Sequence, residues 1–253
     1  MCARTLLLTQ RVKLRFFVGS LDPDIRDDEL QDSTLRSPNI APTDPIAILR
    51  LDAQGPKLSS VRWGLVPDDK RQAPKSAIGR PLINAREDKL LRWGPWRSPF
   101  TARRCLVLVS GWMEWRVEDT LEQQAQTSLF GAAPRSSKPQ RIPYRFQPRG
   151  GGLLALAGMW SPWDPPGAPH TDSAVIITQA AKGDLAGYHD RSPVVLPQSL
   201  WGEWLNPETP EPLSLIQPPQ PGTLEALRLN ERVGRVGDKS EGVQETVGEA
   251  VVL

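Results

Sequence analysis

The sequence has few of the side chains that build metal sites and disulfide frameworks. It contains 253 residues but only two cysteines and two histidines. A structural zinc site would need all four of these side chains, and their spacing along the chain fits no short paired-ligand pattern. A scaffold held by several disulfides is excluded for the same reason. We therefore expect neither a bound metal nor a cofactor.

The sequence also lacks a long hydrophobic run. Its longest apolar stretches, such as Leu153–Trp160, are much shorter than the roughly 20 residues that a membrane-spanning helix needs. The first residues do not lead into a cleavable signal peptide either. We expect a soluble, cytoplasmic monomer that does not associate with membranes.

Charge of one sign does not dominate the chain. It has 31 basic and 29 acidic side chains, for a net charge of +2. The bases are unevenly placed, because residues 1–20 carry four of them and no acid, and arginines outnumber lysines by 23 to 8. Guanidinium groups bind phosphate oxygens in a planar fork, so this bias favours a polyanionic partner. An arginine-rich proteome with solvated charges is an equally good explanation.

The apolar residues form short runs of strand length, separated by proline and glycine turns. The gaps between them are too short for regular crossover helices, which argues against a parallel, doubly wound sheet. We predict an α+β protein with a single β-rich domain, built on a mainly antiparallel, barrel-like sheet with a few peripheral helices. The predicted strands are Ile46–Leu51, Ser60–Leu65, Arg104–Val109, Trp112–Val117, Tyr144–Gln147, Leu153–Trp160 and Ala174–Thr178.

Helices are predicted at few places. Ser199–Leu205 has apolar residues at helical spacing, Thr223–Leu229 is a second candidate, and the segment after Arg4 is a third. The domain is expected to cover residues 1–238, with a surface insertion at 118–140 that is rich in Glu, Gln, Ala, Ser and Pro. Residues 239–253 are expected to form a C-terminal tail.

The most reactive feature is Cys2, which directly follows the initiator Met1. Removal of Met1 would expose an α-amine and a thiol on one residue, with reference pKa values of about 8 and about 8.5. The amine can condense with an aldehyde, and the neighbouring thiol can then close a five-membered thiazolidine ring. Because the second step is intramolecular, its effective molarity can be on the order of 10⁵ M. The alternative is an incidental cysteine in a frayed terminus.

Two further side chains are candidates for proton transfer. Glu114 follows a buried strand and stands between Trp112 and Trp115, so it should lose solvation and have a raised pKa. His189 is one of only two imidazoles in the chain. An outward-facing glutamate and a structural histidine remain the alternatives.

Polar and aromatic residues elsewhere give a weaker signal for a phosphate- and base-binding site. Asn84 and Arg86 are two positions apart, so in an extended segment both point to one face. An amide and a guanidinium on one face suit a site that orients a small polar group and binds a phosphate. Trp63 and Pro42 lie beside rigid turns and are candidates for a base-stacking rim, although tryptophan is more often part of a core.

In order along the chain, these segments resemble the SOS response-associated peptidase (SRAP) family, whose members shield abasic sites in DNA. The first residues differ slightly from the family pattern, because Ala3 stands where the family usually has glycine. The matching segments are Met1-Cys2-Ala3-Arg4, Pro38–Thr43, Arg62–Pro67, Asn84–Glu87, Arg104–Val107 with Gly111–Trp115, Ala155–Trp160, Ile177–Ala181 and His189–Val194.

The resemblance implies a covalent mechanism. In this family the initiator methionine is removed autocatalytically, and the exposed cysteine forms a thiazolidine with the ring-opened aldehyde of an abasic site in single-stranded DNA. Carried over by position, the catalytic residues are Cys2 as nucleophile, Asn84 orienting its amine, Glu114 transferring protons and His189 assisting sugar ring opening. The DNA-binding residues are Arg4, Pro42, Trp63, Arg86 and Thr178. When bound to DNA, such a protein would lie at the nucleoid.

Two other functions are consistent with the same residues. One is a cysteine peptidase that acts in trans, with Cys2 as nucleophile and His189 as base. The other is a non-catalytic single-stranded DNA-binding module that uses Arg4, Arg86 and Trp63.

Overall fold

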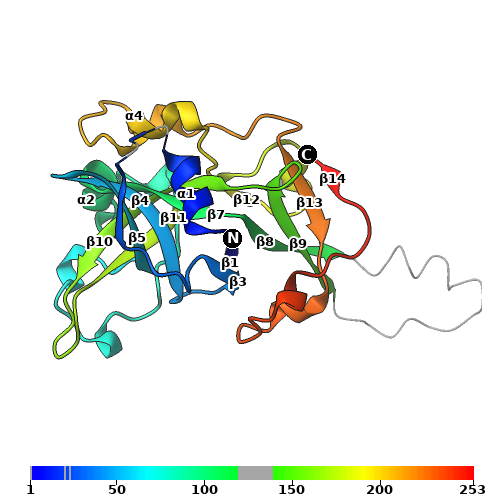
Figure 1. Cartoon of the computed structure of the whole chain (residues 1–253), viewed down its shortest axis with the longest axis horizontal. Helices are drawn as coiled ribbons and strands as arrows, with labels where there is room; N and C mark the ends of the chain where they lie inside the picture. Colours follow the sequence, from blue (N-terminus) through cyan, green and yellow to red (C-terminus); the bar gives the residue numbers. More distant parts are fainter. Residues whose placement is uncertain (1, 20, 23, 119–138) are drawn as a thin grey trace, which may run out of the picture.

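Two β-sheets meet in one β-rich domain, as predicted from the sequence (Figure 1). The computed structural model describes residues 2–19, 21–22, 24–118 and 139–253. The smaller sheet has six strands, in the order β14 (Val251–Val252), β13 (Leu224–Arg228), β9 (Gln140–Pro148), β8 (Gly111–Glu118), β1 (Arg4–Leu8) and β3 (Arg36–Ile40). All pairings in this sheet are antiparallel.

The larger sheet has eight strands and closes into a ring without forming a regular barrel. Its order is β12 (Arg191–Pro193), β11 (Thr171–Ala180), β10 (Leu154–Trp163), β7 (Arg104–Val109), β4 (Pro45–Asp52), β5 (Gly55–Trp63) and β2 (Arg26–Glu29), with β6 (Asn84–Arg86) beside β11. A short parallel pairing of β11 with β5 completes the ring, with Ser173 opposite Arg62. The predicted single β-rich domain with a mainly antiparallel sheet is therefore confirmed, and the barrel-like closure expected from the sequence is a ring that is not a regular barrel.

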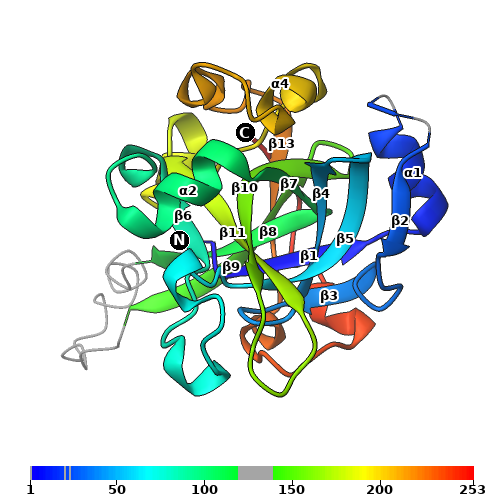
Figure 2. The same ribbon diagram turned by 90° about the vertical axis from the view of Figure 1, so that its left-hand side faces the viewer.

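Burial on both faces explains the continuous apolar strands. In β7 all six residues are buried, because this strand pairs with β4 and β10 near the middle of the ring. The helices α1 (Arg11–Val18), α2 (Gly94–Ala102) and α4 (Trp201–Leu205) lie at the periphery (Figure 2). Trp204 of α4 packs beside Phe100 of α2, with their ring centroids 6.0 Å apart. No described helix is long and apolar enough to cross a lipid bilayer.

One predicted helix is wrong. Residues 223–229 contain β13, in which the buried Leu224 and Ala226 alternate with the more exposed Glu225. The residues favour a helix, but the segment is too short for propensity to decide, and pairing with β9 buries its apolar face. The segment after Arg4 begins as strand β1 and becomes helical only at Arg11.

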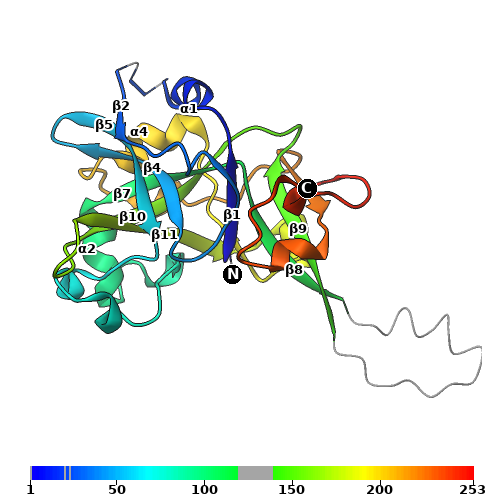
Figure 3. The same cartoon turned by 60° about the horizontal axis from the view of Figure 1, so that its bottom comes forward.

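Most side chains of the expected C-terminal tail, residues 239–253, are exposed, but a few of them are anchored to the domain. Val243 is fully buried against Leu6 and Met113, and Leu253 is buried after β14 pairs with β13. The proposed insertion joins β8 to β9, and its residues 119–138 lie outside the described part of the chain. Strand β1, which begins two residues after Cys2, runs along the junction of the two sheets (Figure 3).

Candidate active site

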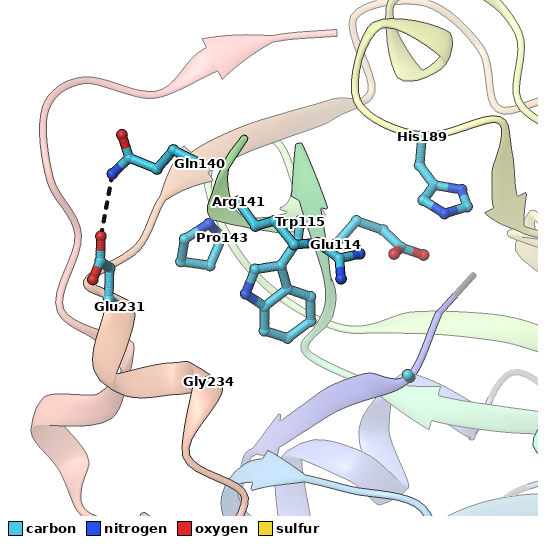
Figure 4. A pocket seen from close by; sticks show the side chains of 9 residues that line it. Glu114, Trp115, Gln140, Arg141, Pro143, His189, Glu231 and Gly234 are labelled. Carbon is cyan, nitrogen blue, oxygen red and sulfur yellow. Dashed lines mark hydrogen bonds between the residues drawn. The ribbon is translucent and has the colours of Figure 1, made fainter. Parts of the chain in front are cut away.

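A pocket of about 630 Å³ opens where the N-terminal strand meets β8, β9 and the loop before β12. Residues that line it come from five segments far apart in the sequence (Figure 4). The lining residues are Ala3, Glu114, Trp115, Gln140, Arg141, Pro143, His189, Glu231 and Gly234. The pairing of Arg4 with Met113 explains the contact of β1 with β8, because extending this register by one position brings Ala3 beside Glu114.

Cys2 is buried next to this pocket, with only 1% of its surface exposed. Its thiol donates a weak hydrogen bond to the carbonyl oxygen of Arg4, with a sulfur–oxygen distance of 3.7 Å. Burial, and secondarily the nearby charge of Glu114, raise the pKa of the Cys2 thiol well above its usual value. In the chain that retains Met1, the thiol is therefore neutral at pH 7 and needs a base to become nucleophilic.

Asn84 contacts the backbone of Cys2. Its side-chain Nδ2 donates a hydrogen bond of 2.6 Å to the Cys2 carbonyl oxygen. The parallel pairing of β6 with β11, with Asn84 opposite Ile176, fixes this side chain beside the N-terminus. Its Oδ1 is buried and has no hydrogen-bond partner among the described residues. The Asn84 side chain can therefore accept a hydrogen bond through Oδ1 from a donor group next to Cys2, such as an α-amine on that residue.

Glu114 is a buried carboxyl group with a perturbed pKa. It is 5% exposed, and burial raises its pKa from 4.5 to about 7. Two positions earlier on the same strand, Trp112 stacks on Phe146 of β9 with ring centroids 5.2 Å apart, which holds the two strands together next to Glu114. Figure 4 shows the Glu114 carboxyl group directed toward the ring of His189. A carboxyl group with a pKa near neutrality can both accept and return a proton.

His189 is held as a neutral imidazole. Burial lowers its pKa, and its Nδ1 accepts a hydrogen bond of 3.0 Å from the backbone N–H of Arg191. The same Nδ1 also lies 2.7 Å from the Asp190 carboxylate. The tautomer that accepts the Arg191 hydrogen bond carries its proton on Nε2. The buried Arg191 anchors this loop through Glu87 and Thr178. This loop support was not anticipated from the sequence.

Arg4 does not project into solvent as a phosphate ligand would. It is 7% exposed, and its guanidinium donates hydrogen bonds to the side chain of Asn39 at 2.6 Å and to the carbonyl of Val233 at 3.0 Å. The Asn39 amide in turn donates to the carbonyls of Arg235 and Asp238, each at 3.1 Å. These contacts fasten the strand that carries Cys2 to the C-terminal segment.

The other predicted DNA-binding residues are divided between core and surface. Trp63 is 0% exposed and its indole N–H donates to the carbonyl of Ile83, so its ring supports the fold from within. Thr178 is also fully buried. Pro42 is half-buried, and Arg86 is exposed in an ion pair with Asp88. Of the five predicted DNA-binding residues, only Pro42 and Arg86 are accessible to a nucleic acid in this conformation.

Asn39 lies in the segment Pro38–Thr43 but was not predicted as a site residue. The only signal in the sequence was a polar residue directly before the apolar pair Ile40-Ala41, which is buried in the structure.

Replacing Asn39 with alanine should lower the unfolding free energy by about 3 kcal/mol, because it leaves the buried Arg4 without its side-chain acceptor. Denaturant unfolding measures this loss. Asn206→Ala is the control, because its exposed side chain caps only one turn. Equal losses in both variants would contradict the assigned role of Asn39.

Comparison with known proteins supports a common family. A sequence model of the SOS response associated peptidase (SRAP) family matches residues 1–236. The abasic site processing protein YoqW of Bacillus subtilis is 29% identical over 198 residues, which cover 77% of this chain and 79% of YoqW. The abasic site processing protein HMCES of Pongo abelii is 28% identical over 225 residues, covering 81% of this chain and 63% of HMCES.

The fold is similar to that of solved structures at lower identity. A crystal structure of a Bacteroides thetaiotaomicron protein superposes with a TM-score of 0.77 and 20% identity, covering 97% of this chain and 100% of that one. A Bordetella bronchiseptica protein gives a TM-score of 0.66 at 18% identity, covering 90% of this chain and 100% of the other. At these identities the likeness establishes the arrangement of the sheets alone.

Proposed function

This chain belongs to the SOS response associated peptidase family, and we propose that it removes its own Met1 and then captures abasic sites in single-stranded DNA through Cys2. The observation that carries this proposal is the position of the Cys2 residue, with the Asn84 amide on its carbonyl and Glu114 close enough to influence its thiol. The names of the relatives YoqW and HMCES, both abasic site processing proteins, support the same substrate.

The first step is hydrolysis of the Met1–Cys2 peptide bond. It consumes one water, whose hydroxyl joins the methionine carboxyl group and whose proton goes to the Cys2 amine. The Glu114 carboxylate is the proposed general base, because its pKa of about 7 leaves much of it ionised at neutral pH. The Asn84 amide holds the Cys2 backbone during this step and offers its Oδ1 to the new amine.

The second step joins the protein to DNA. The Cys2 amine attacks the C1′ aldehyde of the ring-opened sugar, and one water leaves to form an imine. The thiol then adds to the imine carbon, its proton passes to the nitrogen, and a thiazolidine results. Protonated Glu114 supplies the proton that the departing hydroxyl needs. An abasic nucleotide lacks base stacking, so it enters the pocket at reduced cost.

The burial of Cys2 favours self-processing over a peptidase acting in trans. In the chain that retains Met1, the Cys2 residue is 1% exposed, so its thiol lies beside the Met1–Cys2 peptide bond but is covered against a separate polypeptide. Removal of Met1 is proposed to uncover Cys2 for the abasic nucleotide. We further propose a monomer that acts without a cofactor in the cytoplasm, at the nucleoid when bound to DNA. Arg86 and Pro42 are proposed to contact DNA directly, whereas Arg4, Trp63 and Thr178 support the site from beneath.

The proposed function is tested with single-stranded DNA that carries one abasic site. Wild-type protein should give a heat-resistant, slowly migrating species with this DNA and none with the intact strand. Protein shown to lack Met1 that forms no such species would refute the proposal. Cleavage of an added peptide with many turnovers would instead favour the peptidase. Salt-sensitive binding that is indifferent to the lesion would favour the simple DNA-binding module.

His189 is proposed to donate its Nε2 proton to the sugar ring oxygen as the ring opens. His189→Ala should therefore slow capture of an abasic site roughly 10²-fold. Capture of an acyclic aldehyde at the same position in the strand should slow much less, because no ring must open. Quenched time courses on both substrates measure the two rates. Equal slowing on both would show that His189 acts elsewhere in the reaction.

A further inference from the structure

The charges that line the pocket are unfavourable for DNA except at one residue. Glu114 and Glu231 contribute carboxyl groups, and Arg141 is the only lysine or arginine among the described residues that line it. A captured abasic nucleotide has a phosphate on each side, and each carries a negative charge. Bringing these phosphates close to two carboxyl groups requires a nearby cation.

The arginines that the sequence pattern suggests do not meet this need. The guanidinium of Arg4 is occupied by Asn39 and by carbonyls of the C-terminal segment. Arg86 does not line the pocket and is paired with Asp88. Arg116, on the neighbouring strand, lies over the ring of Tyr188, with its guanidinium carbon 5.7 Å from the ring centroid.

Arg141 is accessible and directed into the pocket. It lies near the start of β9, opposite Val117 of β8, and its side chain is exposed. Its backbone pairs with β8, whereas its side chain makes no hydrogen bond or ion pair with any described residue. Figure 4 shows its guanidinium between the ring of Trp115 and the carboxyl group of Glu114. Its positive charge offsets part of the burial-driven rise in the pKa of Glu114 and adds slightly to the burial-driven fall in the pKa of His189, which is consistent with a position near the two groups.

We propose that Arg141 binds a backbone phosphate adjacent to the captured abasic nucleotide. This inference rests on the proposed function, because it assigns a phosphate subsite to the same pocket. A guanidinium can form two parallel hydrogen bonds to one phosphate. Such a pair would fix both the orientation of the DNA strand and how far it enters the pocket. The bound strand then holds its C1′ atom near Cys2 while the phosphate charge is kept from Glu114.

The first test measures the salt dependence of DNA binding in a Cys2→Ala background, in which the thiazolidine cannot form. Arg141→Gln should reduce the slope of log affinity against log salt by about 0.7, the value for one phosphate contact to a single strand. It should also weaken binding about tenfold at low salt. The matched control is Arg149→Gln, an exposed arginine in the turn after β9 whose side chain also makes no hydrogen bond or ion pair with the described residues. It should change neither value.

The second test locates the phosphate. Oligonucleotides carry a neutral methylphosphonate at each position near the abasic site in turn. At one flanking position the substitution should weaken binding of the Arg141-containing protein about tenfold and have no further effect in Arg141→Gln. Losses that simply add at every position would overturn the proposal.

The inference and the proposed function can fail separately. If Cys2-containing protein forms no adduct, the proposed function fails, yet the salt slopes still report whether Arg141 contacts a phosphate. If adducts form and Arg141→Gln has the same slope and affinity as its parent, Arg141 is not a phosphate ligand. An equal effect of Arg149→Gln would show that the loss reflects net charge rather than a site.

Discussion

A Cys2→Ala protein is expected to form no heat-resistant adduct with abasic single-stranded DNA, a loss of roughly 10³-fold or more in yield. The variant has no thiol to close the ring, so any product of an α-amine is an imine. Imines are reversed by water on heating, whereas borohydride reduction traps them. Denaturing electrophoresis with and without borohydride therefore distinguishes two defects. An adduct seen only after reduction shows that the imine forms but the ring does not close, and no adduct under either condition shows that the imine does not form.

Cys105 provides the matched control for this experiment. It is the second cysteine, it is fully buried in β7, and burial raises the pKa of its thiol. Cys105→Ala should lower the unfolding free energy by about 1 kcal/mol through a small cavity. It should leave adduct formation unchanged at temperatures where the variant is folded. Adducts that survive in Cys2→Ala but disappear in Cys105→Ala would exclude the assignment of Cys2.

Glu114→Gln is expected to slow removal of Met1 by roughly 10²- to 10⁴-fold, because glutamine cannot accept a proton. In the wild-type chain the rate should rise with pH and level off above about 7, as the Glu114 carboxyl group ionises. The variant should have lost this dependence. Mass spectrometry of freshly translated protein, sampled over time at several pH values, gives both rates. A variant that processes Met1 at the wild-type rate would remove Glu114 from the mechanism.

The same carboxyl group should make stability depend on pH. Its pKa is raised on folding from 4.5 to about 7, so the folded state retains a proton that the unfolded chain has released. The contribution of Glu114 to the unfolding free energy is fully present below pH 4.5 and is lost as the pH rises through about 7. In a Cys2→Ala background whose intact mass shows that Met1 is retained, the loss should be on the order of 3 kcal/mol. Adding Glu114→Gln should abolish it.

The sequence was most informative where one local pattern decides the structure. The apolar run Arg104–Val109 coincides with β7, because a strand covered on both faces needs a continuous apolar run. Glu114 could be recognised in the same way, since tryptophans on either side of a carboxyl group predict burial. The reactive pair on Cys2 followed from chemistry alone.

Long-range contacts explain what the sequence did not reveal. Arg4 was expected to bind phosphate, but Asn39 and the carbonyls of Val233 and Gly234 surround its guanidinium. No local sequence pattern predicts hydrogen-bond acceptors that lie 229 and 230 positions away from Arg4 in the chain. β13 was missed for a similar reason, because its partner β9 decides its conformation. Arg141 was not predicted as a site residue, because a single arginine in the sequence gives no sign that it will lie in a pocket lined by carboxyl groups.

The central claim is that one residue, Cys2, provides both atoms that bind the DNA after Met1 has left. The intact mass of the adduct with an abasic oligonucleotide tests it most directly. We predict the mass of the chain without Met1 plus that of the complete oligonucleotide, minus one water, and peptide mapping should place the DNA on the N-terminal cysteine. An adduct that retains Met1, or one that maps to any other residue, would contradict the account.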